Sequence, residues 1–120
     1  MDAPRTSGDW SYAGGTATYG IVGNAPVFTF RCDRAAGNVI LSRTGTATNI
    51  VPMRIVTETA TRLLNAVPTG ANVTVSLSAR DPLLDAMAFS KGRFAVEVPG
   101  LPTLYLPSWT EVSRVIEDCR

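Results

Sequence analysis

The residues Val27-Phe28-Thr29-Phe30-Arg31-Cys32 alternate between apolar and polar side chains, as a β-strand with one buried face does. This alternation places Cys32 on the buried side of the strand, together with Phe28 and Phe30. The other cysteine, Cys119, ends a short segment near the C-terminus in which apolar residues recur at helical spacing. Both thiols are therefore expected on buried faces of two elements that lie far apart in the sequence.

A bond between these thiols would staple the C-terminal helix to an early strand and close nearly the whole chain into one loop. In the chain-entropy description, a loop of this size stabilises the fold by roughly 4–5 kcal/mol. It also implies an oxidising compartment. The alternative is that both cysteines are reduced core residues of a cytosolic protein. The matching buried faces favour the bond, so we predict a Cys32–Cys119 disulfide in a periplasmic or secreted protein.

The length of 120 residues suits one domain with a modest core. Residues 1–9 are polar and contain proline and glycine, so we expect a flexible N-terminus followed by a single β-rich domain over residues 10–120. The apolar runs are too short for a transmembrane helix. The first residues show neither the charged nor the apolar region of a signal peptide, so we expect none in this chain.

Turn signals recur at short intervals and separate runs rich in threonine and valine, a pattern typical of an all-β sandwich or barrel. In residues 73–79, apolar side chains alternate with threonine and serine, which predicts an antiparallel strand with one wet face. Pro102 and Pro107 flank the last run, so we expect that strand at an edge. The expected strands are 16–22, 27–33, 39–43, 53–57, 61–67, 73–79, 93–98 and 103–106.

Two helices are expected among these strands. Asp81-Pro82 combines a capping residue with a proline suited to the first helical turn, which predicts a short helix over residues 81–89. Ser108 and Glu111 have the spacing of a capping box, which predicts a second helix from Ser108 to Cys119. The predicted fold is an antiparallel β-sandwich or partly open barrel with a short connecting helix and a C-terminal helix.

The chain contains no histidine, which excludes Ser-His-Asp and Cys-His catalytic arrangements. Ser90 and Lys91 are adjacent, but neighbouring side chains in an extended segment point apart, so we expect no Ser-Lys dyad. Asp81 and Asp85 are the acid–base candidates of a small hydrolase, but we favour the explanation that Asp81 is a helix cap and Asp85 a solvated first-turn acid. No spacing matches a zinc or calcium site. We predict no enzyme, no cofactor and no metal.

The net charge of +1 disfavours a nucleic-acid partner. Among the polar residues, the arginines show the clearest arrangement. Arg31 and Arg43 are expected on the outer face of the hairpin formed by residues 27–33 and 39–43, and Arg34 is expected near its loop. These three residues form a candidate binding surface for an anionic partner, such as an acidic protein, a polysaccharide or a lipid head group. The alternative is that they are solvated side chains that protect the sheet from aggregation.

Two stretches resemble known families. Residues 89–98, followed by 104–109 and a helix that ends in cysteine, are similar to uncharacterised exported proteins of alphaproteobacteria and to the invasion-associated locus B family. Phe30-Arg31-Cys32-Asp33 resembles a Tyr/Phe-x-Cys-Asp hairpin of the membrane-bound lysozyme inhibitor of C-type lysozyme family, in which that cysteine pairs with one near the C-terminus. The Ser-Gly-containing binding loop of that inhibitor family has no counterpart here, so no functional residue is transferred.

The sequence therefore predicts an exported, non-enzymatic module that binds a protein or an anionic envelope component. A small hydrolase that uses acidic residues and a lysozyme-inhibitor-like protein are the alternatives, and self-association is a third role to test. A binding module should present a flat apolar or basic patch, or an open edge strand. A hydrolase should present two converging carboxylates in a concave pocket.

Overall fold

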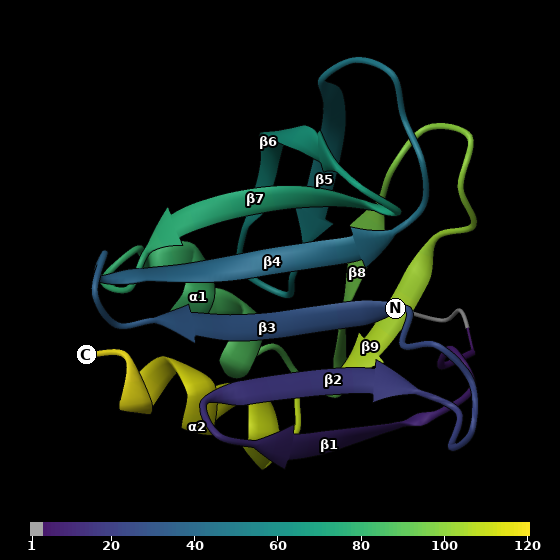
Figure 1. Cartoon of the computed structure of the whole chain (residues 1–120). Coiled ribbons are helices and arrows are strands. Elements are labelled where there is room, and N and C mark those ends of the chain that lie inside the picture. Colours follow the sequence, from purple (N-terminus) through teal and green to yellow (C-terminus); the bar gives the residue numbers. More distant parts are fainter. Residues whose placement is uncertain (1–3) are drawn as a thin grey trace.

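The computed structural model describes residues 4–120, and in this part of the chain nine antiparallel strands form one sheet (Figure 1). The strands are β1 (Asp9–Ala13), β2 (Thr16–Gly20), β3 (Phe28–Asp33), β4 (Asn38–Thr44), β5 (Val51–Val56), β6 (Thr61–Thr69), β7 (Asn72–Ser78), β8 (Arg93–Glu97) and β9 (Leu104–Pro107). Their order across the sheet is β1-β2-β3-β4-β7-β6-β5-β8-β9.

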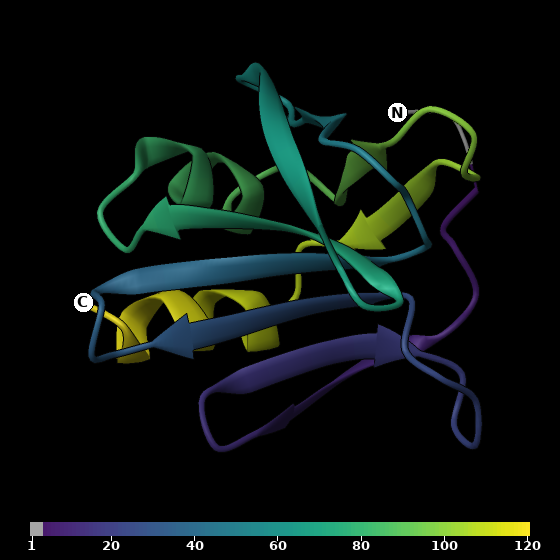
Figure 2. The same cartoon turned by 45° about the horizontal axis from the view of Figure 1, so that its top comes forward.

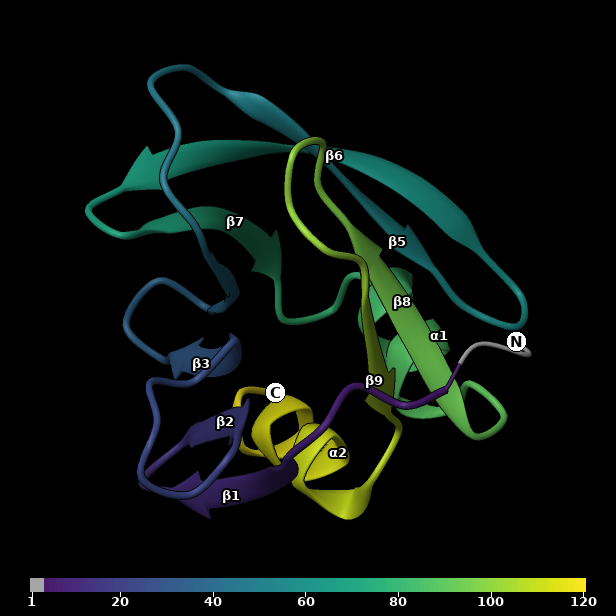
Figure 3. The same ribbon diagram turned by 90° about the vertical axis from the view of Figure 1, so that its right-hand side faces the viewer.

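The sheet curls into a half-barrel, which confirms the predicted β-rich, partly open barrel (Figure 3). The bend lies at β6, which pairs with β5 over residues 61–66 and with β7 over residues 67–69. Figure 2 shows the teal strand β6 crossing β7 steeply at this point. One strand therefore belongs to both halves of the sheet and joins them.

All eight predicted strands are present, with ends that shift by at most a few residues. The inward alternation of residues 73–79 is confirmed, because Val73, Val75, Leu77 and Ala79 are all buried. The last strand, β9, lies at an edge of the sheet as predicted. The other edge strand, β1, was not predicted.

An aromatic cluster fills the inside of the curl. The ring centroid of Phe30 lies 5.4 Å from that of Phe28, 5.7 Å from that of Trp10 and 6.1 Å from that of Phe94. Trp10 also packs edge-on against Tyr19, with centroids 5.0 Å apart. All five rings are buried. Burial of one such side chain stabilises the folded state by about 1.5–3 kcal/mol, so this cluster supplies a large part of the stabilisation that comes from the core.

The outer face of the sheet carries hydroxyl side chains over β1 to β4 and β7. The strand register places five of them in one row across the five strands: Ser11, Thr18, Thr29, Ser42 and Thr74. The Ser11 and Thr18 oxygens lie 3.0 Å apart, and those of Ser42 and Thr74 lie 3.4 Å apart. Cross-strand hydroxyl pairs of this kind stabilise a sheet modestly and leave its surface polar.

Helix α1 (Pro82–Ala88) begins where the sequence predicts it. Asp81 is its N-cap and accepts a hydrogen bond of 2.9 Å from the Leu83 amide, and Pro82 occupies the first turn. The helix buries its apolar side chains, among them Leu84 and Met87, inside the curl. The carboxylate of Asp81 also receives two hydrogen bonds from the guanidinium of Arg62 on β6. This ion pair fixes the start of α1 against the first residues of β6.

Helix α2 (Thr110–Asp118) begins one residue later than a helix capped by Ser108 would, and the predicted capping box is wrong. Its N-cap is Trp109, without a side-chain cap. The hydroxyl of Ser108 instead donates a 2.8 Å hydrogen bond to the Met87 carbonyl at the end of α1. The reason is that Ser108 directly follows β9, whose last residue is Pro107, so its side chain connects strand and helix rather than starting a helix.

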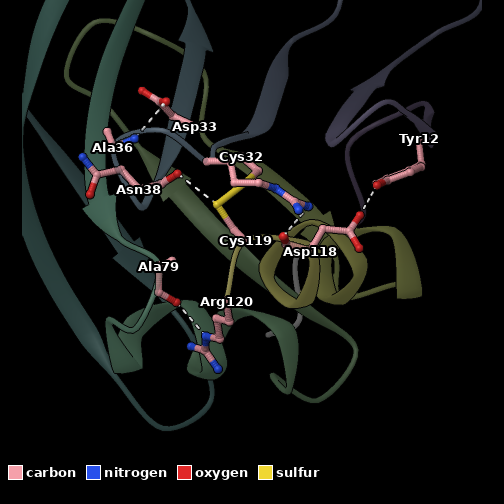
Figure 4. The surroundings of a disulfide bond; sticks show 10 residues. Tyr12, Cys32, Asp33, Ala36, Asn38, Ala79, Asp118, Cys119 and Arg120 are labelled. Atoms are coloured by element: carbon pink, nitrogen blue, oxygen red, sulfur yellow. Dashed lines mark hydrogen bonds between the residues drawn. A yellow bond between two sulfur atoms is a disulfide. The ribbon is translucent and has the colours of Figure 1, made fainter.

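Helix α2 lies on the open side of the curl, between β1 and β9 (Figure 3). It buries Val112, Val115 and Ile116. Beyond its last turn, the sulfur atoms of Cys32 and Cys119 are 2.17 Å apart, which is the predicted disulfide (Figure 4). Among the described residues, no helix is long and apolar enough to span a membrane.

Four polar contacts hold the same end of α2. The Asp118 carboxylate accepts a hydrogen bond from the Tyr12 hydroxyl, and the Asp118 carbonyl accepts one of 2.7 Å from Arg34 (Figure 4). Arg120 pairs with the carboxylate of Asp85 on α1 and donates a 2.6 Å hydrogen bond to the Ala79 carbonyl. The disulfide is thus one of several anchors between α2, the sheet and α1.

The described part of the N-terminus contacts the sheet, which differs from the flexible segment expected over residues 1–9. The Thr6 amide donates to the Tyr105 carbonyl (2.9 Å), and the Tyr105 amide donates to the Thr6 hydroxyl (2.8 Å). The Trp10 indole donates a 2.7 Å hydrogen bond to the Pro107 carbonyl. These contacts tie the segment before β1 to the edge of β9. Residues 1–3 lie outside the described residues.

We expect protein prepared under oxidising conditions to resist alkylation until it is reduced, as measured by mass spectrometry. Two alkylated thiols in unreduced protein would contradict the disulfide.

Replacing both cysteines (Cys32→Ala with Cys119→Ala) should lower the free energy of unfolding by about 4–5 kcal/mol, because the unfolded chain is no longer closed into a long loop. Denaturant unfolding of the double variant and the oxidised parent measures this difference.

Candidate functional site

The predicted arginine surface is not formed as expected. Arg31 is exposed on the outer face of β3. Arg34 follows β3 and donates a hydrogen bond to the Asp118 carbonyl, so it caps the C-terminal end of α2, where a cation is favourable. These two residues lie near the disulfide. The third, Arg43, lies near the other end of the hairpin and on the opposite face.

Arg43 is buried, with 6% of its surface exposed, and its predicted outward position is wrong. The register places it beside Phe28 on β3 and Val73 on β7, both of which point into the core. Its guanidinium donates hydrogen bonds to the carbonyls of Thr44 (2.6 Å) and Pro102 (2.8 Å). Burial lowers the pKa of Arg43 from its ordinary value. The chain positions it inward because strand alternation determines the face, and the carbonyls make that position tolerable.

These positions separate the effects of two arginine substitutions. We expect Arg43→Gln to lower the free energy of unfolding by about 1–3 kcal/mol, because a shorter amide leaves at least one of the two carbonyls without its donor. Arg31→Gln is the matched control and should change stability by less than about 0.5 kcal/mol. Denaturant unfolding decides this. Equal midpoints for the two variants would show that Arg43 is not held in the interior.

The two carboxylates considered for acid–base chemistry are engaged in structural contacts. Asp81 caps α1 and pairs with Arg62, whose hydrogen bonds lower the pKa of the Asp81 carboxyl; the Leu83 amide lowers it further. Asp85 forms two hydrogen bonds with Arg120, at 2.8 and 2.9 Å. The capping role predicted for Asp81 is confirmed, whereas Asp85 is paired rather than simply solvated.

The lowered pKa of Asp81 predicts a pH dependence of stability. The pKa of the Asp81 carboxyl is lower in the folded state than its unfolded value of about 3.9. The Arg62 pair therefore stabilises the fold fully above about pH 5. This contribution disappears as the pH falls through the lowered pKa.

The variant Asp81→Asn keeps a good cap but loses the ion pair, so it should be less stable than the parent at pH 7 by about 1 kcal/mol. The difference from the parent should shrink in acid. Stability curves measured by denaturant at several pH values test this. A difference that stays constant into strong acid would mean that the pair does not form.

The hydroxyl of Ser90, the residue next to Lys91, is engaged in structural hydrogen bonds. Ser90 is buried, its hydroxyl donates a 2.8 Å hydrogen bond to the Arg93 carbonyl, and it accepts one of 3.0 Å from the Glu58 amide. Because this hydroxyl both donates and accepts a hydrogen bond to the main chain, its role is to stabilise the turn. Within residues 4–120, no group of three or more His, Cys, Asp and Glu side chains is placed to hold a metal ion.

A different surface stands out on β5 and β6. Ile50, Leu63 and Val67 have 63%, 65% and 50% of their surfaces exposed, and Pro52 is exposed beside them. The register opposes Arg54 to Leu63, and the outer side chains of both strands therefore share one face. Ile50 precedes Val51, which opposes Ala66, so continuing the register brings Ile50 next to Val67. We call these four residues the aliphatic patch.

A cleft of about 410 Å³ adjoins the aliphatic patch. Its floor is formed by Pro52, Arg54 and Leu63 with Glu97 on β8, and its wall by the loop between β8 and β9. Arg54 and Glu97 are 3.6 Å apart and both are largely exposed, so their attraction is weak. The cleft thus combines an aliphatic edge with one cation and one anion that remain accessible to a partner.

The aliphatic patch was not predicted from the sequence. The signal in the sequence is Leu63-Leu64, two large apolar residues in succession within an alternating strand, so that one of them must point outward. In the row of side chains that crosses the sheet, the hydroxyl residues end at Thr74 and the next position is Val67. The outer surface therefore changes from hydroxyl to aliphatic at β6.

No protein-family model matches the chain, and no curated protein or solved structure shows significant similarity to it. The resemblance to the invasion-associated locus B and lysozyme-inhibitor families therefore stays a prediction. Any functional argument has to come from the chain's own residues.

Proposed function

We propose that the protein is a non-enzymatic module that binds a partner protein through the aliphatic patch and its adjoining cleft. The observation that carries this proposal is the exposure of Ile50, Leu63 and Val67 on one face of two paired strands. Large apolar side chains gathered on a surface are typical of protein interfaces, whereas singly scattered ones are ordinary. Arg54 and Glu97 give the rim of the patch both signs of charge, which supports specificity.

A location in the periplasm or outside the cell belongs to the same proposal. Its support is the Cys32–Cys119 disulfide, since such bonds persist in oxidising compartments. An anionic envelope component is a weaker candidate for a surface contact, because only Arg31 of the three predicted arginines is exposed on the outer face. Arg34 is hydrogen-bonded to the Asp118 carbonyl, and Arg43 is buried. A hydrolase is also weaker, because Asp81 and Asp85 are each paired with an arginine.

A photo-crosslinking amino acid at position 63 tests the proposal directly. We expect it to yield a discrete adduct in envelope extract, whereas the same group at position 76, on the hydroxyl face, should yield none. Adducts of equal yield at both positions, or none at position 63, would contradict the proposal. Size-exclusion chromatography with light scattering distinguishes an adduct with a second copy of the chain from one with another protein.

Variants then measure how much the patch contributes. Leu63→Asn combined with Val67→Thr should weaken partner capture by about tenfold or more, since two exposed aliphatic contacts are lost. Val22→Thr is the matched control, because Val22 is 97% exposed in the loop before β3, away from the patch. Equal capture by both variants would show that the partner binds elsewhere.

A further inference from the structure

Arg43 carries the most unusual polar group in the described part of the chain. Its Nε is buried and has no hydrogen-bond partner, and no other buried side-chain nitrogen or oxygen there lacks one. None of the described carboxylates lies within ion-pair distance of its guanidinium. An arginine stays protonated near neutral pH, so the interior holds a positive charge that two carbonyls compensate only in part.

The geometry of the guanidinium shows which ligand would suit it. Nε and Nη2 lie on the same side of the guanidinium and together present two parallel N–H groups, which bind the two oxygens of a carboxylate or phosphate. Here the Pro102 carbonyl accepts from Nη2 alone, at 2.8 Å, and Nε is left over. The carbonyl supplies one oxygen, whereas the fork formed by the Nε and Nη2 N–H groups can bind two.

The group that covers Arg43 is a short loop, which begins at the buried residue Val98. The loop between β8 and β9, residues 98–103, turns at Gly100, which has a φ of 82°, and exposes Pro99 and Pro102. Leu101 packs on Gly45, where a built Cβ would lie 2.5 Å from the Leu101 side chain. Besides this packing, the hydrogen bond from Arg43 to Pro102 holds the loop to β4.

We propose that Arg43 is the base of an oxyanion-binding site and that residues 98–103 form a strap that closes it. A carboxylate or phosphate group would take the hydrogen bonds of Nε and Nη2, and the Pro102 carbonyl would leave Nη2 as the strap lifts. Nη1 would keep its bond to Thr44, so the arginine stays oriented. The site needs no residue of the aliphatic patch, but the strap also forms the wall of the adjoining cleft.

The side-chain Nε–H of Arg43 reports binding directly by NMR in the unmodified protein. Sodium acetate and, separately, inorganic phosphate are titrated against sodium chloride at constant ionic strength. We expect a saturable shift of the Arg43 Nε–H and of the amides of Gly100, Leu101 and Thr103 with at least one of the two oxyanions, and none with chloride. The absence of any saturable shift, or an equal shift with chloride, would overturn the proposal.

Two variants and one vesicle sample complete the test. Arg43→Lys keeps the charge but loses the fork, so saturable shifts of the strap amides should weaken about tenfold or more. Arg31→Lys is the matched surface control and should behave as the parent. Strap shifts unchanged in Arg43→Lys would overturn the assignment to Arg43. Where phosphate binds, vesicles of phosphatidylglycerol compared with phosphatidylcholine show whether a lipid phosphate reaches the site or only a free one.

Discussion

The fold depends on what fills the space between the two edges of the curled sheet. β1 and β9 do not pair with each other, and the sheet encloses its aromatic core from one side only. Helix α2 covers the open side with Val112, Val115 and Ile116. A helix of nine residues is not stable alone in water, so its position must come from its contacts. The disulfide, the Arg34 and Tyr12 contacts and the Arg120–Asp85 pair supply them at one end, and Ser108 supplies one at the other.

Local patterns predicted most of the elements, because each depends on neighbouring residues. Alternation located eight strands, and Asp81-Pro82 located α1. β1 was missed although Trp10 and Tyr12 alternate with Ser11 and the dipeptide Gly14-Gly15 marks a two-residue hairpin. The strand order could not be predicted, since β7 lies between β4 and β6 and no local signal encodes which distant edges pair. The capping box failed because the preceding strand continues to Pro107 and changes the role of Ser108.

The candidate site was less predictable than the fold, and Arg43 shows why. Val39, Leu41 and Arg43 alternate along β4, so the strand period alone places all three on the inner face. The general preference of charged side chains for solvent predicts the opposite face for Arg43, and here the strand period prevails. What makes the inward position tolerable is the Pro102 carbonyl, which is 59 residues away and contributed by a loop. The aliphatic patch was locally visible in Leu63-Leu64, but its extent depends on how β5 and β6 pair.

The strap connects the two proposed surfaces. Val98, Leu101 and Thr103 line the cleft beside the aliphatic patch, while the Pro102 carbonyl between them faces Arg43. A movement that lifts Pro102 from the guanidinium must therefore reshape the wall of the cleft. If a partner fits the cleft in only one position of the strap, oxyanion binding and partner binding change each other's affinity by the same factor, because coupling between two sites is reciprocal. The sign of that coupling depends on which position of the strap the partner needs. The buried charge is then more than a structural cost, since it would make a short loop responsive to an anion.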